Sequence, residues 1–362
     1  MGRMRPAGLV KRGDIWHIDK RIGGRRLCES TGETELDKAE LYLAMRIERA
    51  RRASIYGERP KRTFRDAVKR YLRENQHKRS IDDDELHVKQ LDPLIGNLDL
   101  RMVHMGTLQP FIAKRQRQGK KTKTINIALA VVRRILNLAA SQWMDEYGLT
   151  WLERPPKITL LKVTDARKPY PLSWEEQTRL LKEMPDHLAR MALFKVNTGC
   201  REQEVCSLRW EWEVEVPELE TSVFIIPEAL VKNGEERLVV LNRIAKSVVD
   251  GERGKHEEYV FTWRGRRLGK MNTTSWRQGR ARVGLPQVRV HDLKHTFGRR
   301  LRAAGVSFED RQDLLGHRSG RITTHYSAAE LENLLYAANQ VVGQGSRKAP
   351  ALLVLKKKAA SA

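Results

Sequence analysis

The spacing of apolar residues along the chain predicts mostly helices with a few short strands. Residues 14–19 alternate apolar and polar side chains, a Gly-Gly pair marks a turn, and residues 25–30 complete a two-strand ribbon. Residues 35–53 follow with apolar positions on one helical face, which suits a helix that covers the ribbon. We expect these elements to form a small N-terminal unit over residues 1–60.

A helical bundle is predicted next, over residues 63–150. Its four helices are expected at residues 64–76, 82–91, 108–118 and 124–143. Thr63 and Thr107 are the expected N-caps of the first and third helices, and Pro93 with Gly96 is expected to stop the second. The fourth helix has the most continuous apolar stripe, so we expect it to supply much of the core.

A proline-rich linker separates the bundle from a third domain, predicted over residues 168–342, and a basic tail over residues 343–362 is expected to be disordered. Ser173 and Glu176 form a capping-box pattern at the first helix of the third domain. Further helices are expected at residues 174–183, 187–196 and 203–208. From residue 292 the chain is expected to be helical again, with breaks at Gly305, Gly316 and Gly320, and to finish with a helix at residues 328–341. Strands are expected at residues 222–226, 229–232, 237–241 and 259–263. Asn-Gly between the second and third strands predicts a hairpin. The fold class is therefore mainly α with small β elements, α+β.

Composition then narrows the possible partners. The 362 residues include 69 Lys and Arg against 45 Asp and Glu, a formal charge of +24. Such a charge favours a nucleic acid partner over a membrane, because no apolar run of membrane-spanning length or amphipathic anchor accompanies it. The 40% hydrophobic content excludes a wholly disordered chain. Three cysteines without metal-ligand spacing are too few for a disulfide framework, so we expect a reducing cytoplasm.

Two clusters of cations are candidate DNA-binding surfaces. The first lies at one end of the bundle and comprises Lys114, Arg115, Arg117, Lys120, Lys121 and Lys123. It is either a solvated helix end or a surface that holds phosphates. The second lies within residues 263–282, which contain no acidic residue, and comprises Arg264, Arg266, Arg267, Lys270, Arg277 and Arg280. Such a mixture with glycines and hydroxyl groups is typical of contact with a phosphate backbone.

Four scattered segments of the third domain carry residue types that suit chemistry better than packing. Arg201 has a carboxylate three residues on, which would hold its guanidinium, although a plain surface ion pair is the alternative. Lys232 lies at the tip of the predicted hairpin, where most lysines only aid solubility. His291 and Lys294 begin a helix and can face one anion. His317 precedes Tyr326 by nine residues.

These segments, in this order, resemble the tyrosine recombinase (phage integrase) family. The elements that carry the resemblance are Arg201, Lys232, His291-x-x-Lys294, Leu314-Leu315-Gly316-His317 and Tyr326. The resemblance implies that Tyr326 is a nucleophile that forms a covalent 3′-phosphotyrosyl bond with DNA. Arg201, Lys294 and His317 would stabilise the phosphate, His291 would assist proton transfer, and Lys232 would be the general acid. It further implies catalysis without a metal ion, ATP or another cofactor.

One position departs from the family pattern, because Lys294 stands where the family has a second arginine. The charge is kept but the planar, two-pronged donor is lost, and Arg299 or Arg300 is a candidate substitute. Two alternatives stay open on sequence alone: a catalytically weakened DNA-binding or architectural protein of the same fold, and a DNA-relaxing enzyme similar to type IB topoisomerases.

The expected partner is double-stranded DNA carrying attachment or core sites, cut to integrate or excise a phage or mobile element. The resemblance also implies a homotetramer on DNA, in which protomers exchange the C-terminal helix, and accessory DNA-bending proteins. The alternative is that this helix packs on its own domain. We expect a cytoplasmic, nucleoid-associated protein in a bacterial host and no membrane partner.

Overall fold

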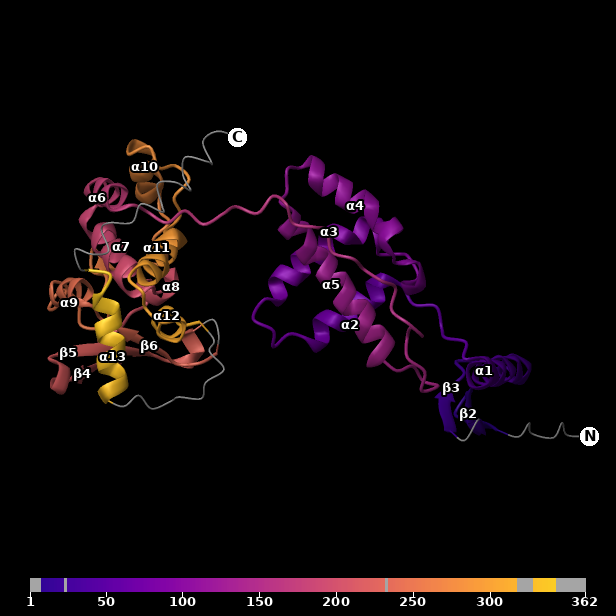
Figure 1. The fold of residues 1–362 in the computed structure, drawn as a ribbon. Helices are drawn as coiled ribbons and strands as arrows, with labels where there is room; N and C mark the ends of the chain where they lie inside the picture. The colour runs from indigo at the N-terminus through magenta and orange to yellow at the C-terminus, as the bar shows by residue number, and fades with distance from the viewer. Residues whose placement is uncertain (1–7, 23–24, 232–233, 318–327, 343–362) are drawn as a thin grey trace, which may run out of the picture. The chain divides into compact units, whose positions relative to one another are not determined.

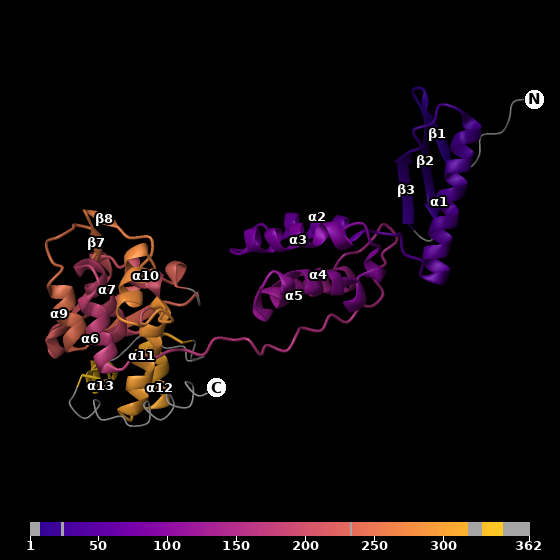
Figure 2. The same ribbon diagram turned by 90° about the horizontal axis from the view of Figure 1, so that it is seen from above.

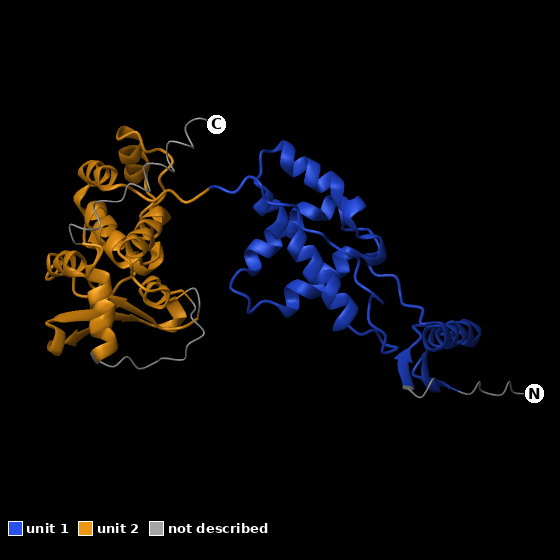
Figure 3. Ribbon diagram, in the orientation of Figure 1, with its two compact units in different colours: residues 1–167 blue, residues 168–362 orange. Residues whose placement is uncertain are grey.

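The structure is a computed structural model that describes residues 8–22, 25–231, 234–317 and 328–342. It divides into two compact units, residues 1–167 and residues 168–362 (Figure 3). Helices dominate both units, and the sheets are small and antiparallel. The predicted α+β class is confirmed.

Unit 1 begins with an antiparallel sheet of three strands, β1 (Leu9–Arg12), β2 (Ile15–Ile22) and β3 (Arg25–Ser30), in that order. Helix α1 (Leu36–Tyr56) lies along this sheet (Figure 2). The buried side chains of Trp16, Ile18 and Leu43 form the core between them. The sequence predicts β2, β3 and α1. It misses β1, a four-residue strand in which two cations hide the alternation.

A helical bundle with its own core follows in unit 1. Its helices are α2 (Phe64–Glu74), α3 (Ile81–Ile95), α4 (Met105–Arg117) and α5 (Thr122–Ser141), with a 3₁₀ turn at Leu100–Met102. Thr63 is the N-cap of α2, as predicted, and the structure adds a capping box with Asp66. α5 is long and apolar enough to cross a membrane by length and composition, but more than half of that stretch is buried in the bundle core.

Two predicted helix boundaries in the bundle are wrong. Pro93 does not stop α3, which runs through it and ends at Gly96, because a proline so near the end removes only one intrahelical hydrogen bond. Thr107 does not begin α4. His104 is the N-cap, its Nδ1 accepts the N–H of Gly106, and Thr107 completes a capping box from the third helical position.

Unit 2 contains an antiparallel sheet of β4 (Glu213–Val216), β5 (Thr221–Ile226) and β6 (Arg237–Val240), in that order. Its helices are α6 (Trp174–Lys182), α7 (Asp186–Thr198), α8 (Glu202–Cys206), α9 (Arg243–Asp250), α10 (Thr274–Arg282), α11 (Val290–Ala303), α12 (Phe308–Leu315) and α13 (Ala328–Asn339). A hairpin of β7 (Thr262–Trp263) and β8 (Arg266–Arg267) precedes α10. Ser173 caps α6 through the predicted capping box with Glu176.

The strand predicted at residues 229–232 is wrong for the part that the structure describes. Glu228–Leu230 forms a 3₁₀ turn, and β6 pairs with β5 instead. The Asn-Gly pair therefore belongs to a longer β5–β6 connection. β4 was not predicted, because the alternation of Glu and Val over four residues is too short to stand out.

The C-terminal helix α13 packs on its own unit. It lies beside α12 and β6 (Figure 1). Leu334 and Ala338 of α13 are buried in a cluster with Phe297, Leu301 and Leu314. In the isolated chain, α13 therefore packs on its own domain, which is the alternative to exchange between protomers.

Candidate active site

A tight glycine turn places Arg201 between two helices. α7 ends at Gly199, whose φ of +65° lies in the left-handed region that favours glycine. A Cβ atom there would lie 2.8 Å from Phe297 and 2.9 Å from Leu315, so the space also requires glycine. The chain reverses within two residues, and α8 begins with Arg201 as its N-cap.

The Arg201 side chain is held by Glu204, as the sequence predicts. Glu204 accepts the backbone N–H of Arg201 at 2.6 Å and the guanidinium Nη1 at 2.7 Å. Burial favours a raised pKa for this carboxyl, but Arg237 and Arg201 outweigh it and the pKa of Glu204 is lowered. A buried carboxylate thus fixes the guanidinium as a rigid donor.

Lys294 reaches the same turn from α11. Only 5% of the residue is exposed, and its ammonium donates to the carbonyl oxygens of Gly199, at 2.7 Å, and of Leu315. Burial, and after it the charge of Arg237, lower the pKa of Lys294 to about 6. The ammonium therefore gives up its proton near neutral pH unless an anion lies beside it.

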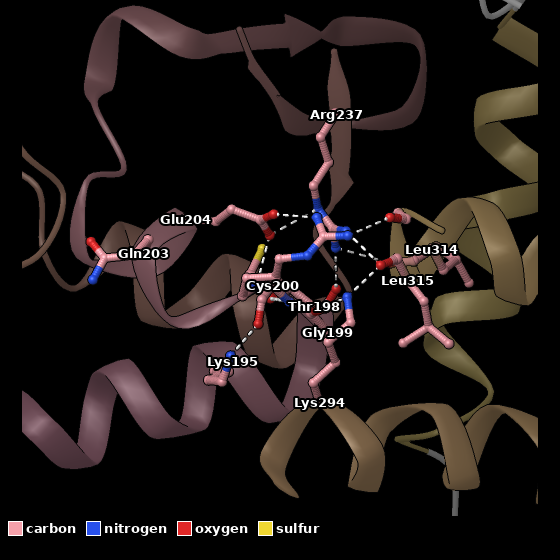
Figure 4. A network of polar contacts seen from close by, with 12 residues as sticks. Lys195, Thr198, Gly199, Cys200, Gln203, Glu204, Arg237, Lys294, Leu314 and Leu315 are labelled. Carbon is pink, nitrogen blue, oxygen red and sulfur yellow. Dashed lines mark hydrogen bonds and ion pairs between the residues drawn. The ribbon is translucent and has the colours of Figure 1, made fainter. Parts of the chain in front are cut away.

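The C-terminal turn of α12 connects these cations (Figure 4). α12 ends with Gly316 at a φ of +58°, and its last carbonyl groups have no partner within the helix. Three cationic side chains far apart in sequence donate to the carbonyls of residues 314–316: Arg201, Arg237 and Lys294. We call these three the cation cluster. Gln203, on the same helix as Glu204, points away from it.

Sequence reasoning missed two buried cations near the turn. Arg237 begins β6 and is 3% exposed. Lys195 on α7 is fully buried and donates to the carbonyl of Cys200, and burial lowers its pKa to about 8. The sequence did contain a signal for both, because each cation adjoins apolar residues. Arg237 directly precedes Leu-Val-Val, and Lys195 lies within the apolar pattern of α7.

Of the two arginines considered as substitutes, Arg300 is engaged elsewhere. Its guanidinium stacks 3.5 Å from the ring centre of Trp174 and donates to Gln177 at 2.8 Å. Arg299 is half-buried on the same helix. The arginine beside Lys294 is Arg237.

The two predicted histidines are close in sequence to the cation cluster and its turn, because His291 comes three residues before Lys294 and His317 follows Gly316 directly. His291 is in the first turn of α11, exposed, with its ring edge-on to His295 at 4.8 Å between centroids. Loss of solvent, and then the charge of His295, lower the pKa of His291 to about 4. His317 follows the α12 turn, and its N–H donates to the carbonyl of Gln312. Loss of solvent and the charge of Lys294 lower its pKa as well. Both rings are neutral at pH 7.

Lys232 and Tyr326 lie outside the described residues. The structure therefore brings together Arg201 and Lys294 with the turn that leads to His317, and it leaves the general acid and the nucleophile as predictions.

The basic cluster of the bundle is on the surface of unit 1. Five of its six members are exposed, and Arg115 is half-buried with its Nη1 on Gln118. Lys121 donates to the carbonyl of Asp165. The pKa of the nearby Asp165 carboxyl is lowered, first by the backbone N–H of Thr122 and to a smaller extent by Lys121. Exposed cations of this kind are what a phosphate-binding surface requires.

The second basic cluster surrounds the β7–β8 hairpin and α10. Arg264, Arg266, Arg267, Lys270 and Arg277 are exposed, and Arg264 stacks 4.6 Å from the ring centre of Trp263. Arg280 differs, because it is half-buried and its guanidinium donates to the carbonyl of Val288. Arg280 is thus tied to the backbone of its own unit, whereas the other five are exposed.

The sequence of unit 2 matches a known family over almost all of its described helices. The family model described as the phage integrase family matches residues 172–332, which include Arg201, the α11 pair, His317 and Tyr326. The chain therefore carries a phage integrase family domain over residues 172–332. The integrase of Salmonella phage P22 is 25% identical over 374 residues, covering 92% of this chain and 94% of that one.

Further relatives agree with this match. The tyrosine recombinase XerC of Rhodospirillum centenum is 29% identical over 260 residues, covering 66% of this chain and 72% of that protein. A lambda integrase dimer bound to a COC′ core site shares the fold, with a TM-score of 0.56, 12% identity and coverage of 92% and 96%. These relatives are integrases and recombinases, so the architectural and topoisomerase alternatives are not favoured.

Proposed function

We propose that the protein is a site-specific recombinase that cuts and rejoins double-stranded DNA through a 3′-phosphotyrosyl bond at Tyr326. The observation that carries this proposal is the cation cluster: Arg201 and Lys294, 93 positions apart in the chain, share one glycine-bounded turn that continues into His317. Preorganised cations are the largest contribution that a protein can make to the charged transition state of phosphoryl transfer. The phosphotyrosyl ester itself stores the energy of the broken phosphodiester, so rejoining needs no ATP.

The reaction balances with the residues named. The Tyr326 phenol loses its proton toward His291, whose neutral imidazole can accept it. The phenolate oxygen forms a bond to phosphorus, and the bond from phosphorus to the 5′ oxygen breaks. Lys232 gives a proton to that leaving oxygen. Attack by a 5′ hydroxyl of another strand reverses these steps and releases Tyr326, so neither a metal ion nor a cofactor is required.

Arg201 and Lys294 share the phosphate charge differently. The guanidinium of Arg201 keeps its charge at any working pH. Lys294 is an ammonium with its pKa lowered to about 6, and an adjacent phosphate favours the protonated form. We therefore expect DNA binding to be accompanied by uptake of a proton at Lys294 near pH 7.

The solved structures of lambda integrase include a dimer on a COC′ core site and a tetramer on a Holliday junction. We carry this over as a proposal: the chain binds core-type sites in double-stranded DNA and works as a homotetramer, with accessory DNA-bending proteins. The exposed basic clusters of both units support DNA binding. Because α13 packs in cis in the isolated chain, exchange of this helix would accompany assembly. We place the protein in the bacterial cytoplasm, with the nucleoid, where it integrates or excises a phage or mobile element.

Trapping of the covalent intermediate tests the proposal. A pool of nicked duplexes randomised around the nick lets the short 5′-hydroxyl fragment diffuse away after cleavage, so an adduct accumulates. We expect an adduct whose modified peptide contains Tyr326 and its loss in Tyr326→Phe, with DNA affinity retained. Tyr336→Phe is the matched control, since Tyr336 is 68% exposed on α13. An adduct on another residue, or recombination by Tyr326→Phe, would refute the assignment.

A further inference from the structure

Arg237 is the most enclosed member of the cation cluster. It lies at the first residue of β6, donates hydrogen bonds to two segments of unit 2 and forms an ion pair with a third (Figure 4). Nη1 donates to the carbonyl of Leu315 at 2.6 Å, and Nη2 to those of Leu314 at 3.3 Å and Thr198 at 3.4 Å. Nε lies 3.3 Å from Oε2 of Glu204. No side of the guanidinium faces open solvent, since its side chain is 2% exposed.

Two partners of Arg237, Glu204 and Leu315, also hold a residue assigned to the reaction. Glu204 binds Arg237 through Oε2 and the Arg201 guanidinium through Oε1. The carbonyl of Leu315 accepts from both Arg237 and Lys294. Arg237 is therefore connected to Arg201 through one carboxylate and to Lys294 through one carbonyl oxygen.

The same contacts fix the start of the segment that leads to His317. α12 has its carbonyl end at this turn, where partial negative charge gathers and cations are favoured. Arg237 meets two of the terminal carbonyls, and Arg201 meets the next, that of Gly316. A Cβ atom on Gly316 would lie 1.8 Å from Nη1 of Arg237. The guanidinium is thus packed directly against the residue before His317.

Packing alone does not explain an arginine at this position. A buried guanidinium loses its hydration, and an apolar residue of similar size would avoid that cost. What arginine supplies is a planar set of donors that can meet a carboxylate and several carbonyls at once. Lysine offers a single point charge with three donors and cannot span all three segments.

We propose that Arg237 is a positioning residue of the recombination reaction: it locks Glu204 and the C-terminal turn of α12 together, so that Arg201, Lys294 and His317 face one phosphate. This inference rests on the proposed function. Arg237 contacts none of the reacting groups and acts through these partners.

The test compares Arg237→Met and Arg237→Lys with a matched control, Arg300→Met. Arg300 is also a buried arginine of unit 2, but its partners Gln177 and Trp174 lie outside the cluster. A nicked duplex that wild type selects from the randomised pool serves as substrate, and single-turnover cleavage is measured apart from DNA affinity. We expect Arg237→Met to cleave about 100-fold more slowly per folded molecule, with affinity within about threefold, because small displacements of aligned groups cost rate rather than binding.

Arg237→Lys should recover part of this loss, since an ammonium can still bridge Glu204 and one carbonyl. Arg300→Met should cleave at the wild-type rate per folded molecule, even where its folded fraction is lower. Equal rates for Arg237→Met and Arg300→Met would overturn the proposal. Failure of wild type to form any adduct would refute the proposed function instead.

Hydrogen exchange provides a readout that does not depend on cleavage. In Arg237→Met we expect amides of residues 312–317 to exchange at least about tenfold faster than in wild type, because the turn loses its fixed donors. In Arg300→Met the same amides should exchange as in wild type. Unchanged exchange of this turn in Arg237→Met would overturn the positioning role even if the cleavage rate falls.

Discussion

Replacement of Gly316 by alanine tests the buried position of Arg237 directly. Gly316 ends α12 in the left-handed region with a φ of +58°, and the added methyl would lie 1.8 Å from Nη1 and 2.7 Å from Cζ of Arg237. Atoms cannot approach so closely, so the guanidinium must leave its place. It would then lose the hydrogen bonds that it donates to the carbonyls of Leu315 and Leu314.

The loss of folding stability expected for Gly316→Ala has two separable parts. A left-handed alanine costs about 1 kcal/mol relative to glycine. Hydrogen bonds from a charged donor contribute about 1.5–3 kcal/mol each, and a displaced buried charge loses more than one of them, so the collision adds about 3 kcal/mol or more. Gly305 isolates the first part, because its φ is +78° and nothing lies within 4 Å of the position of its Cβ. Gly305→Ala should therefore cost only about 1 kcal/mol.

The measurement is urea denaturation of the full chain, with hydrogen exchange of the buried α7 amides reporting the unfolding of unit 2. We expect Gly316→Ala to lose about 3 kcal/mol more stability than Gly305→Ala and to lose cleavage in addition. Equal losses for the two variants, within about 0.5 kcal/mol, would show that the Arg237 guanidinium does not lie against this turn, and the reasoning on the cluster would be refuted.

Two further predictions concern charge. Lys294→Met removes an ammonium whose pKa is lowered from 10.5 to about 6. The unfolded chain binds that proton over this window and the folded chain does not. Wild type should therefore gain stability over the variant between pH 6.5 and 9, by up to about 1.4 kcal/mol per pH unit. Urea denaturation across this range measures the gain, and a constant difference would contradict it. The second prediction concerns a triple variant in which Lys114, Lys120 and Lys123 are replaced by alanine. The slope of log DNA affinity against log salt concentration should become shallower by about 0.9 for each phosphate that the variant no longer neutralises. Fluorescence anisotropy of labelled DNA measures this slope. Lys89→Ala, which removes an ammonium already paired with Glu85 at 2.7 Å, is the control, and an unchanged slope in the triple variant would indicate a merely solvated helix end.

Local rules predict well those elements that local contacts stabilise. The N-cap at Thr63 and the capping box of Ser173 were visible because their signals lie within one turn. The α5 stripe was visible because its period is long and regular. The same rules misplaced the start of α4, where His104 is the cap in place of the usual serine or threonine. They also missed β1 and β4, each four residues long, because strands that short depend on their neighbours.

In the candidate site too, contacts between residues close in sequence could be predicted and contacts between distant residues could not. Arg201 and Glu204 are three residues apart, so the sequence predicts their ion pair and the structure confirms it. Arg237 could not be found in this way. Its partners lie at residues 198, 204, 314 and 315, and only the folded unit brings them to one point. Its role depends on carbonyl oxygens, which every residue has, so no side-chain pattern can indicate them.

The contacts of Lys294 bear on why a lysine can stand at a position where the family has arginine. An ammonium carries three donors. Two of them are used by the carbonyls of Gly199 and Leu315, which leaves one for a phosphate oxygen. In the proposed reaction, Lys294 would deliver a full charge and a single hydrogen bond, while Arg201, which Glu204 and the Gly316 carbonyl hold in place, would supply the rigid guanidinium contact. On this reasoning the substitution changes how the phosphate is shared between the two cations, and the rigidity of Arg201 matters more here than in a site with two arginines.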